Sequence, residues 1–162
     1  MRTQYINVSR CIQLHYRLFS VVVLSITADN EISHLYIDGC EFTNLKNGKV
    51  WEKADSVTLS LTANVIAVQI LNVGDVGGLL ASTDTISLRT DVTWKVTTNY
   101  TSGWMNVNFD DTSWKNATAY GNNGDQPWKN VSAITENAQW ISTENILDKS
   151  VFFRYHLKRR HF

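Results

Sequence analysis

The sequence predicts an all-β domain, either a sandwich or a barrel, and three observations carry that prediction. Short stretches rich in Val, Ile and Thr recur along the chain, turns of Asn, Asp and Gly separate them, and no segment keeps a helical period of apolar residues over three turns. The 162 residues are 43% hydrophobic and include a single proline. A chain of this length buries roughly 70% of its unfolded surface, so one domain can fold without a metal or a disulfide.

The segments with the composition of strands are residues 22–27, 32–37, 56–61, 64–71, 79–82, 85–90, 93–97, 138–141 and 151–157. The first is rich in Val and Ile, and the second alternates so that one side faces a core. The polar link at residues 28–31 is typical of a tight connection, and Asp38 with Gly39 predicts a second turn.

The middle of the chain carries the strongest strand. Residues 64–71 are almost continuously apolar, which predicts a strand buried on both faces. Residues 72–78 are a glycine loop without the Lys and Ser/Thr of a phosphate cradle, so its expected role is to let the chain turn sharply before residues 79–82. Two further strands, 85–90 and 93–97, follow.

The rest of the chain is less regular. Residues 99–130 are rich in loop-forming residues and carry three tryptophans, after which 138–141 and 151–157 close the domain. The domain therefore spans residues 22–157. Residues 1–21 match the pattern poorly and are either a first strand or an altered chain start. The apolar run at residues 18–26 has features of a signal peptide, but the Val and Ile content of residues 22–28 favours a strand. For the basic tail at 158–162 we expect solvation.

Charge and composition exclude several classes of function. Fifteen basic and fifteen acidic residues give a net charge of zero, which argues against a nucleic-acid partner. No apolar run approaches the ~20 residues that a membrane-spanning helix needs. Cys11 and Cys40 allow either one disulfide or two buried thiols.

Glycosylation sequons favour an extracellular protein. They begin at Asn7, Asn99, Asn116 and Asn130. Each predicts a glycosylated, secreted surface, with Asn99, Asn116 and Asn130 as the sites we expect to be used. A chain rich in Asn, Ser and Thr also produces sequons by chance.

Several stretches, in this order along the chain, resemble the galactose-binding-domain-like jelly rolls: residues 24–31 with 35–39, 64–69 with 77–81, 109–114, and 140–143 with 151–155. The resemblance covers about residues 22–157. Asp38 stands where these modules usually have Asn before Gly, and no good match to their first strand precedes residue 22.

That resemblance implies a jelly-roll β-sandwich, of the type found as accessory modules beside glycoside hydrolases and in extracellular lectin-like proteins. It implies carbohydrate binding as the common activity and Ca²⁺ as the usual metal. Oxygen ligands are available at Asp29, Asn30, Glu31, Asp75 and Asp91, without the spacing of a known calcium loop. For Asp29 and Asn30 a structural hairpin turn is the preferred interpretation.

No catalytic constellation is recognisable, so we expect no enzyme. The histidines at 15, 34, 156 and 161 are scattered, there is no nucleophile elbow, and the two distant cysteines do not make a zinc site. Glycoside hydrolysis needs two carboxylates across a cleft. Asp110 and Asp111 are adjacent instead, and we expect them to order a turn while Phe109 and Trp114 pack.

Sugar binding needs flat aromatic faces together with carboxylates and amides that fix hydroxyl groups. Residues 120–128 supply polar groups, and two tryptophans are candidate platforms. The predicted contacts are Trp104, Asn122, Asn123, Asp125 and Trp128. The alternative for both tryptophans is that they plug the sandwich, as we expect for Trp51, Trp94, Trp114 and Trp140.

The sequence thus predicts a non-catalytic, extracellular, lectin-like module. It would bind a carbohydrate or a glycoprotein glycan through loops at one end of a jelly-roll sandwich. Two alternatives are a structural or adhesive protein-interaction domain and a detached accessory domain of a glycoside hydrolase.

Overall fold

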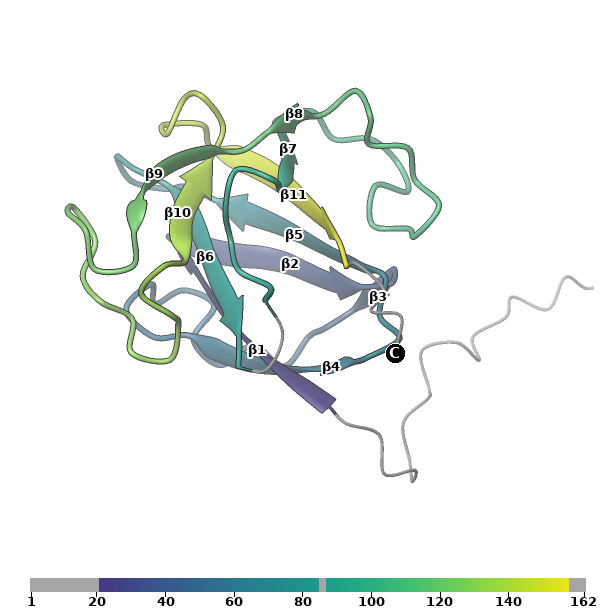
Figure 1. Cartoon of the computed structure of the whole chain (residues 1–162). Coiled ribbons are helices and arrows are strands. Elements are labelled where there is room, and N and C mark those ends of the chain that lie inside the picture. Colours follow the sequence, from purple (N-terminus) through teal and green to yellow (C-terminus); the bar gives the residue numbers. More distant parts are fainter. Residues whose placement is uncertain (1–20, 85–86, 158–162) are drawn as a thin grey trace, which may run out of the picture.

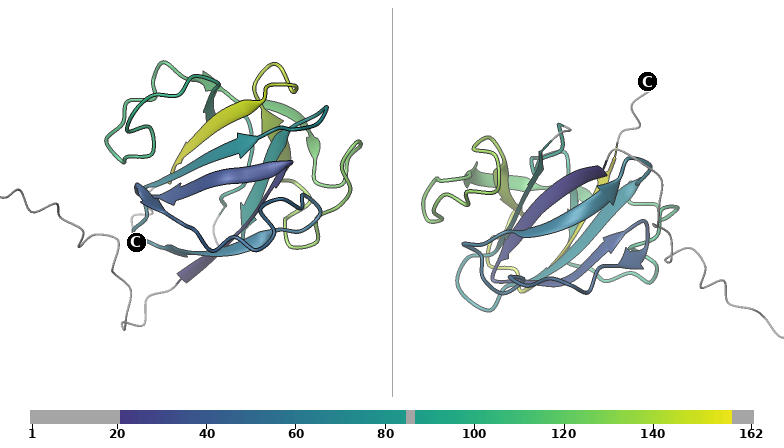
Figure 2. Two further views of the ribbon diagram at one scale, coloured as in Figure 1. Left: turned by 180° about the vertical axis from the view of Figure 1, so that it is seen from behind. Right: turned by 90° about the horizontal axis from the view of Figure 1, so that it is seen from below.

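The computed structural model describes residues 21–84 and 87–157, and these residues form two antiparallel sheets (Figures 1 and 2). The described residues contain no helix, so the all-β prediction is confirmed and the architecture is compatible with a β-sandwich. No helix suited to crossing a bilayer occurs in these two ranges. Asn7, Cys11 and the tail at 158–162 lie outside the described residues.

The five-stranded sheet, called sheet 1, has the strand order β4-β1-β6-β10-β9. Its strands are β1 (Val21–Asp29), β4 (Asp55–Ser60), β6 (Gly78–Thr83), β9 (Thr118–Asn122) and β10 (Gln139–Ser142). The six-stranded sheet, called sheet 2, has the order β3-β2-β5-β11-β7-β8. Its strands are β2 (Glu31–Ile37), β3 (Cys40–Glu41), β5 (Val65–Leu71), β7 (Lys95–Thr97), β8 (Lys115–Asn116) and β11 (Ser150–His156).

The main core lies between the two sheets. Every second side chain of the central strands points into it, as the period of two along a strand requires. Buried members from both sheets are Leu24, Ile26, Leu79, Ile66 and Phe153. The core therefore fastens sheet 1 to sheet 2 and makes them one unit.

β5 is buried on both faces, as its apolar run predicted. Ile66 and Val68 belong to the main core, whereas Val65 and Ala67 face a second cluster on the outer side of sheet 2. Sheet 1 shows the same arrangement, because Leu80 of β6 faces an outer cluster of its own. The outer cluster of sheet 2 contains Trp104 and Trp114 from a long loop, whereas that of sheet 1 combines Trp128 from a loop with Trp140 of β10.

The link between β1 and β2 corrects the hairpin that the sequence suggested. Only Asn30 separates the two strands, but β1 belongs to sheet 1 and β2 to sheet 2, so the chain crosses from one sheet to the other. The Asn30 Oδ1 accepts hydrogen bonds from the backbone N–H groups of Val73 (2.7 Å) and Gly74 (2.9 Å). The polar link is thus structural, and it also holds the glycine loop.

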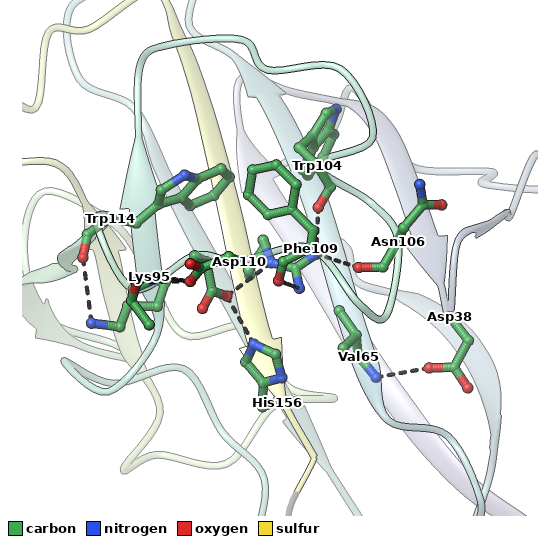
Figure 3. A network of polar contacts seen from close by, with 12 residues as sticks. Asp38, Val65, Lys95, Trp104, Asn106, Phe109, Asp110, Trp114 and His156 are labelled. Carbon is green, nitrogen blue, oxygen red and sulfur yellow. Dashed lines mark hydrogen bonds and ion pairs between the residues drawn. The ribbon is translucent and has the colours of Figure 1, made fainter.

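The turn at Asp38 and Gly39 is confirmed, with φ angles of 52° and 82°. Asp38 does more than turn the chain, because its Oδ1 accepts the backbone N–H groups of Asn64 and Val65, both at 2.8 Å (Figure 3). A carboxylate is a stronger acceptor than an amide oxygen. This gives a physical reason for Asp at a position where the resembling modules usually have Asn.

Three local predictions differ from the structure. The strand expected at 85–90 is not formed over 87–90, where only an isolated bridge pairs Ser82 with Arg89; residues 85 and 86 lie outside the described residues. The Thr90 hydroxyl takes part in hydrogen bonding with the Ala81 backbone, which replaces part of a strand ladder with side-chain contacts.

The other two differences concern loops. The region 99–130 contains two short strands, β8 and β9, that its turn-rich composition concealed. In the glycine loop, Gly77 is required by close packing, because a Cβ atom there would lie 2.8 Å from the Asn72 Cβ. The expectation of a sharp turn missed this contact.

Candidate functional site

The two tryptophans predicted as sugar platforms are covered by protein. Trp104 is 2% exposed and packs edge-on against Phe152, with ring centroids 5.1 Å apart. Trp128 is also 2% exposed and stacks on Trp140 at 4.6 Å and 14°. Neither ring offers a face to a ligand in this conformation, which corrects their predicted role and matches the packing alternative.

The polar residues predicted beside Trp128 divide into two groups. The Asn123 side chain is buried and donates to the carbonyl oxygens of Val131 (3.0 Å) and Ile134 (2.8 Å), and its Oδ1 accepts the Val131 N–H. Asn122 and Asp125 are exposed, and Asp125 Oδ2 accepts the Asn122 backbone N–H at 2.8 Å. Only Asn122 and Asp125 therefore remain accessible to a ligand.

Two long loops cover the outer faces of the sheets, and they project on opposite sides of the molecule in Figure 1. The Asn123 cap, residues 123–138, covers Leu80 of sheet 1 with Trp128, Val131 and Ile134. At its base the Trp128 Nε1 donates to Asp29 Oδ2 at 2.8 Å. Burial raises the pKa of Asp29, and the hydrogen bond from Trp128 offsets this only in part.

The Arg154 cap, residues 99–114, covers the outer face of sheet 2. Arg154 on β11 is fully buried, and its Nε donates to Asp111 Oδ2 at 2.8 Å. Its two Nη groups donate to the backbone carbonyl oxygens of Trp104, Asn106 and Phe109 (Figure 3). One guanidinium thus organises the whole turn of the cap.

The neighbouring aspartates of this cap have different roles. Asp110 Oδ1 accepts the N–H and the hydroxyl of Thr112, at 3.0 and 2.7 Å, so it orders a turn as predicted. Asp111 is instead the partner of Arg154, and His156 Nε2 lies 2.8 Å from the same carboxylate oxygen. Burial alone would raise the pKa of Asp111, but the hydrogen bonds from Arg154 and His156 outweigh it, and the pKa is lowered.

A groove of about 350 Å³ opens beside Trp114. Its walls are residues 96–99 of β7 and the chain after it, residues 113–116 around β8, and residues 143–145 with Asp148 of the loop between β10 and β11. These segments gather at the top of Figure 1. The volume lies at the lower end of the roughly 300–1,000 Å³ typical of small-molecule sites.

The groove presents the chemical groups that a polyhydroxylated ligand requires. Hydroxyl groups come from Thr97, Thr98, Ser113 and Thr143, amides from Asn99, Asn116 and Asn145, and carboxylates from Glu144 and Asp148. Trp114 also lines the groove, but its ring is only 8% exposed and packs against Trp104 and Phe109, as the sequence predicted. The Lys95 ammonium group donates to the Trp114 carbonyl oxygen at 3.3 Å (Figure 3). Lys115 and Glu144 form an exposed ion pair at 3.1 Å between two of the walls.

The loop that forms the third wall is held by its own side chains. Asp148 accepts hydrogen bonds from the Thr143 hydroxyl (2.5 Å) and from Asn145 Nδ2 (2.9 Å). The Tyr120 hydroxyl donates to the Thr143 carbonyl oxygen at 2.8 Å, and the Gly77 N–H donates to the Ile146 carbonyl oxygen. The wall is therefore positioned before any ligand arrives, which reduces the entropic cost of binding.

The three described sequon asparagines are all exposed. Asn99 and Asn116 line the groove, whereas Asn130 lies in the Asn123 cap and is not among the groove residues. Exposure is necessary for glycan attachment, but whether any of these sites carries a glycan stays a prediction.

The described residues contain no group of three or more His, Cys, Asp or Glu side chains that could hold a metal ion. Among the residues considered for Ca²⁺, Asp29 accepts from Trp128 and Asn30, and Asp91 Oδ1 accepts the Thr93 N–H and hydroxyl. These carboxylates serve local structure. Binding of Ca²⁺ therefore stays a prediction.

Sequence reasoning missed the groove residues other than the sequon asparagines. Thr143, Asn145 and Asp148 have the spacing of a side-chain-ordered turn, so the turn itself was recognisable. Nothing in the sequence places that turn opposite β7 and β8, because the three walls are far apart along the chain.

No known protein family, no curated protein and no solved structure is significantly similar to this chain.

Proposed function

We propose that the chain is a non-catalytic, extracellular carbohydrate-binding module whose sugar ligand lies in the groove beside Trp114. The observation that carries this proposal is the lining of the groove, where hydroxyl, amide and carboxylate side chains gather from three segments. Sugars present hydroxyl donors and acceptors all around the ring, so this polar lining is complementary to them. The proposed site replaces Trp104 and Trp128, whose rings are buried.

The carboxylates of the groove favour binding over hydrolysis. Asp148 accepts hydrogen bonds from Thr143 and Asn145, and Glu144 pairs with Lys115. A glycosidase needs one carboxylic acid that donates a proton and one carboxylate free to attack or to activate water. Here both carboxylates already have hydrogen-bond or ion-pair partners within the protein, which suits acceptors for sugar hydroxyls better than a reacting pair.

We further propose that the two sheets form a jelly roll of the galactose-binding-like type. Its support is the order of the resembling stretches and their match to β1, β2, β5, β6, β10 and β11. The same family likeness favours an accessory domain beside a glycoside hydrolase as a compatible context. A purely structural or adhesive domain is the competing hypothesis, and it predicts no sugar affinity.

The first experiment is a glycan array on folded protein produced without N-glycans, with and without Ca²⁺. We expect a hit, and we expect Thr97→Val or Asn116→Ala to weaken it by about tenfold, the effect of losing one hydrogen bond of ~1–1.5 kcal/mol. The matched control is Asn122→Ala, an exposed amide remote from the groove lining. Its affinity should equal that of the wild type.

Two results would overturn this proposal. Silence across the array from folded protein would favour the structural hypothesis. A hit abolished by Asn122→Ala and unaffected by the groove variants would move the site to the turn between β9 and β10, beside Asp125.

A further inference from the structure

Two of the three sequons in the described residues open on one groove, and this pairing leads to a second proposal. Asn99 and Asn116 are exposed, both line the groove, and no hydrogen bond occupies either carboxamide within the described residues. The β7–β8 register places Asn116 opposite Lys95, whereas Asn99 follows the other end of β7, two residues after Thr97. The two acceptor nitrogens thus belong to two adjacent walls of the groove and stand at opposite ends of the β7–β8 pair.

We propose that N-glycans attached at Asn99 and Asn116 lie along the groove and close it to soluble sugars. The competition with soluble sugars rests on the proposed function, but the position of the glycans does not. Attachment joins Nδ2 to the anomeric carbon of a lipid-diphosphate-linked oligosaccharide. The glycosyl–phosphate bond breaks, the lipid diphosphate leaves, and the amide loses one proton to the transferase.

Tethering is the physical reason that a modest site becomes occupied. A group held by a short flexible link experiences an effective concentration of about millimolar. The hydroxyls, amides and carboxylates that suit a free sugar equally suit the first residues of an attached one. A glycan attached at either asparagine therefore fills the groove even where a free sugar of the same kind binds weakly.

Asn130 provides the internal control. It is exposed, it carries a sequon, and it lies in the Asn123 cap outside the groove lining. A glycan there extends into solvent. The inference accordingly predicts two kinds of glycan on one molecule, with the groove glycans sheltered and the Asn130 glycan free.

The test uses the full chain secreted from a eukaryotic cell, with site occupancy measured by peptide mass mapping. Release by peptide N-glycosidase is then timed on the folded protein. If the glycans lie in the groove ~90% of the time, only the remaining tenth is accessible, so Asn99 and Asn116 should be cleared about tenfold more slowly than Asn130. After unfolding, all three sites should be cleared at one rate.

Variants that remove a sequon but keep its asparagine complete the test. Thr101→Val with Thr118→Val should restore binding of the array hit to the secreted protein, whereas Ser132→Ala, which removes only the Asn130 sequon, should not. Empty Asn99 and Asn116 sites, or equal release rates in the folded protein, would overturn the inference. A silent array with slow release at the groove sites would refute the sugar-binding function and leave the glycan positions supported.

Discussion

The Arg154 cap and the Asn123 cap solve the same packing problem with different polar chemistry. Each covers the outer face of one sheet with at least one tryptophan, and each must satisfy the carbonyl groups of an irregular loop. The Arg154 cap uses one guanidinium, which reaches three carbonyl oxygens and Asp111. The Asn123 cap uses one neutral amide, which reaches two carbonyl oxygens and one N–H.

The difference shows what a buried charge adds to a loop. A guanidinium has five N–H donors and can hold several carbonyl groups at once, but it must bring a carboxylate with it. An amide has two donors and needs no counter-charge, so it holds a smaller turn without electrostatic cost. The charged cap should therefore be the more fragile of the two when its central residue is removed.

The largest effect is expected for Arg154→Met. The substitution leaves Asp111 without its buried partner and orphans the carbonyl groups of Trp104, Asn106 and Phe109. Breaking a buried ion pair costs about 3–5 kcal/mol. Urea unfolding followed by tryptophan fluorescence measures the change in the free energy of unfolding.

Two further variants separate charge from hydrogen bonding in this cap. Arg154→Met with Asp111→Leu removes the orphaned carboxylate, so it should recover part of the lost stability but not the part due to the carbonyl groups. Arg154→Lys keeps the charge and loses the planar fork, and we expect it to lie between wild type and Arg154→Met. A wild-type free energy for Arg154→Met would show that the pair is not buried in solution.

A smaller loss is expected for Asn123→Ala in the neutral cap. The variant loses three hydrogen bonds, each worth about 1 kcal/mol, so we expect a cost of ~2–3 kcal/mol. Because no charge is involved, the loss should be the same at low and high salt. Asn123→Asp should be at least as destabilising, since a carboxylate cannot donate to the carbonyl oxygens of Val131 and Ile134. Wild-type stability of Asn123→Asp would contradict this bonding pattern.

Trp128→Phe tests the contact between the Asn123 cap and β1. The ring stays large enough to stack on Trp140, but the hydrogen bond to Asp29 is lost. We expect a cost of about 1–2 kcal/mol from the lost bond and the reduced contact. The matched variant Trp104→Phe removes no side-chain hydrogen bond recorded for the described residues, so its cost should reflect packing alone. The second readout is the pKa of Asp29 measured by NMR, which should rise in Trp128→Phe because the bond lowers it. The same pKa in wild type and in Trp128→Phe would contradict the assigned bond.

The fold was predictable because its signals are local. The apolar run at residues 64–71 indicates a strand buried on both faces, and Asp38 with Gly39 indicates a turn, whatever the rest of the chain does. The sheet to which a strand belongs depends on residues far away in the sequence. The local pattern at Asn30 therefore predicts a hairpin turn, whereas this residue joins strands of two different sheets.

The candidate site was predictable only in its residue types. Arg154 lies within an apolar strand, and arginine is almost never fully buried unless it is paired. Its burial beneath the cap could be predicted only by knowing that Asp111, 43 positions away, is its partner. Similarly, the composition of 120–128 suggests a sugar site, but burial of Asn123 and Trp128 depends on how that loop folds back on sheet 1.

The smallest expected effect is a pH dependence of opposite sign in the two caps. Burial raises the pKa of Asp29 above its usual 3.8, so as pH falls the folded chain takes up this proton before the unfolded chain does. Folding therefore gains stability as pH falls through the raised folded-state pKa toward 3.8. The pKa of Asp111 is held below 3.8, despite its burial, by hydrogen bonds from Arg154 and His156. Its stabilising contribution is complete above 3.8 and is lost as pH falls through the lowered value.

Urea unfolding of wild type, Asp29→Asn and Asp111→Asn between about pH 3 and pH 7 separates these contributions. The advantage of wild type over Asp111→Asn should shrink below the usual carboxyl pKa. Relative to Asp29→Asn, wild type should instead gain stability as pH falls toward that value. Because the two variants differ from wild type by one titratable group each, parallel curves for either pair would mean that its carboxylate titrates alike in the folded and unfolded chain. In that case the electrostatic contrast between the caps would reduce to hydrogen-bond count alone.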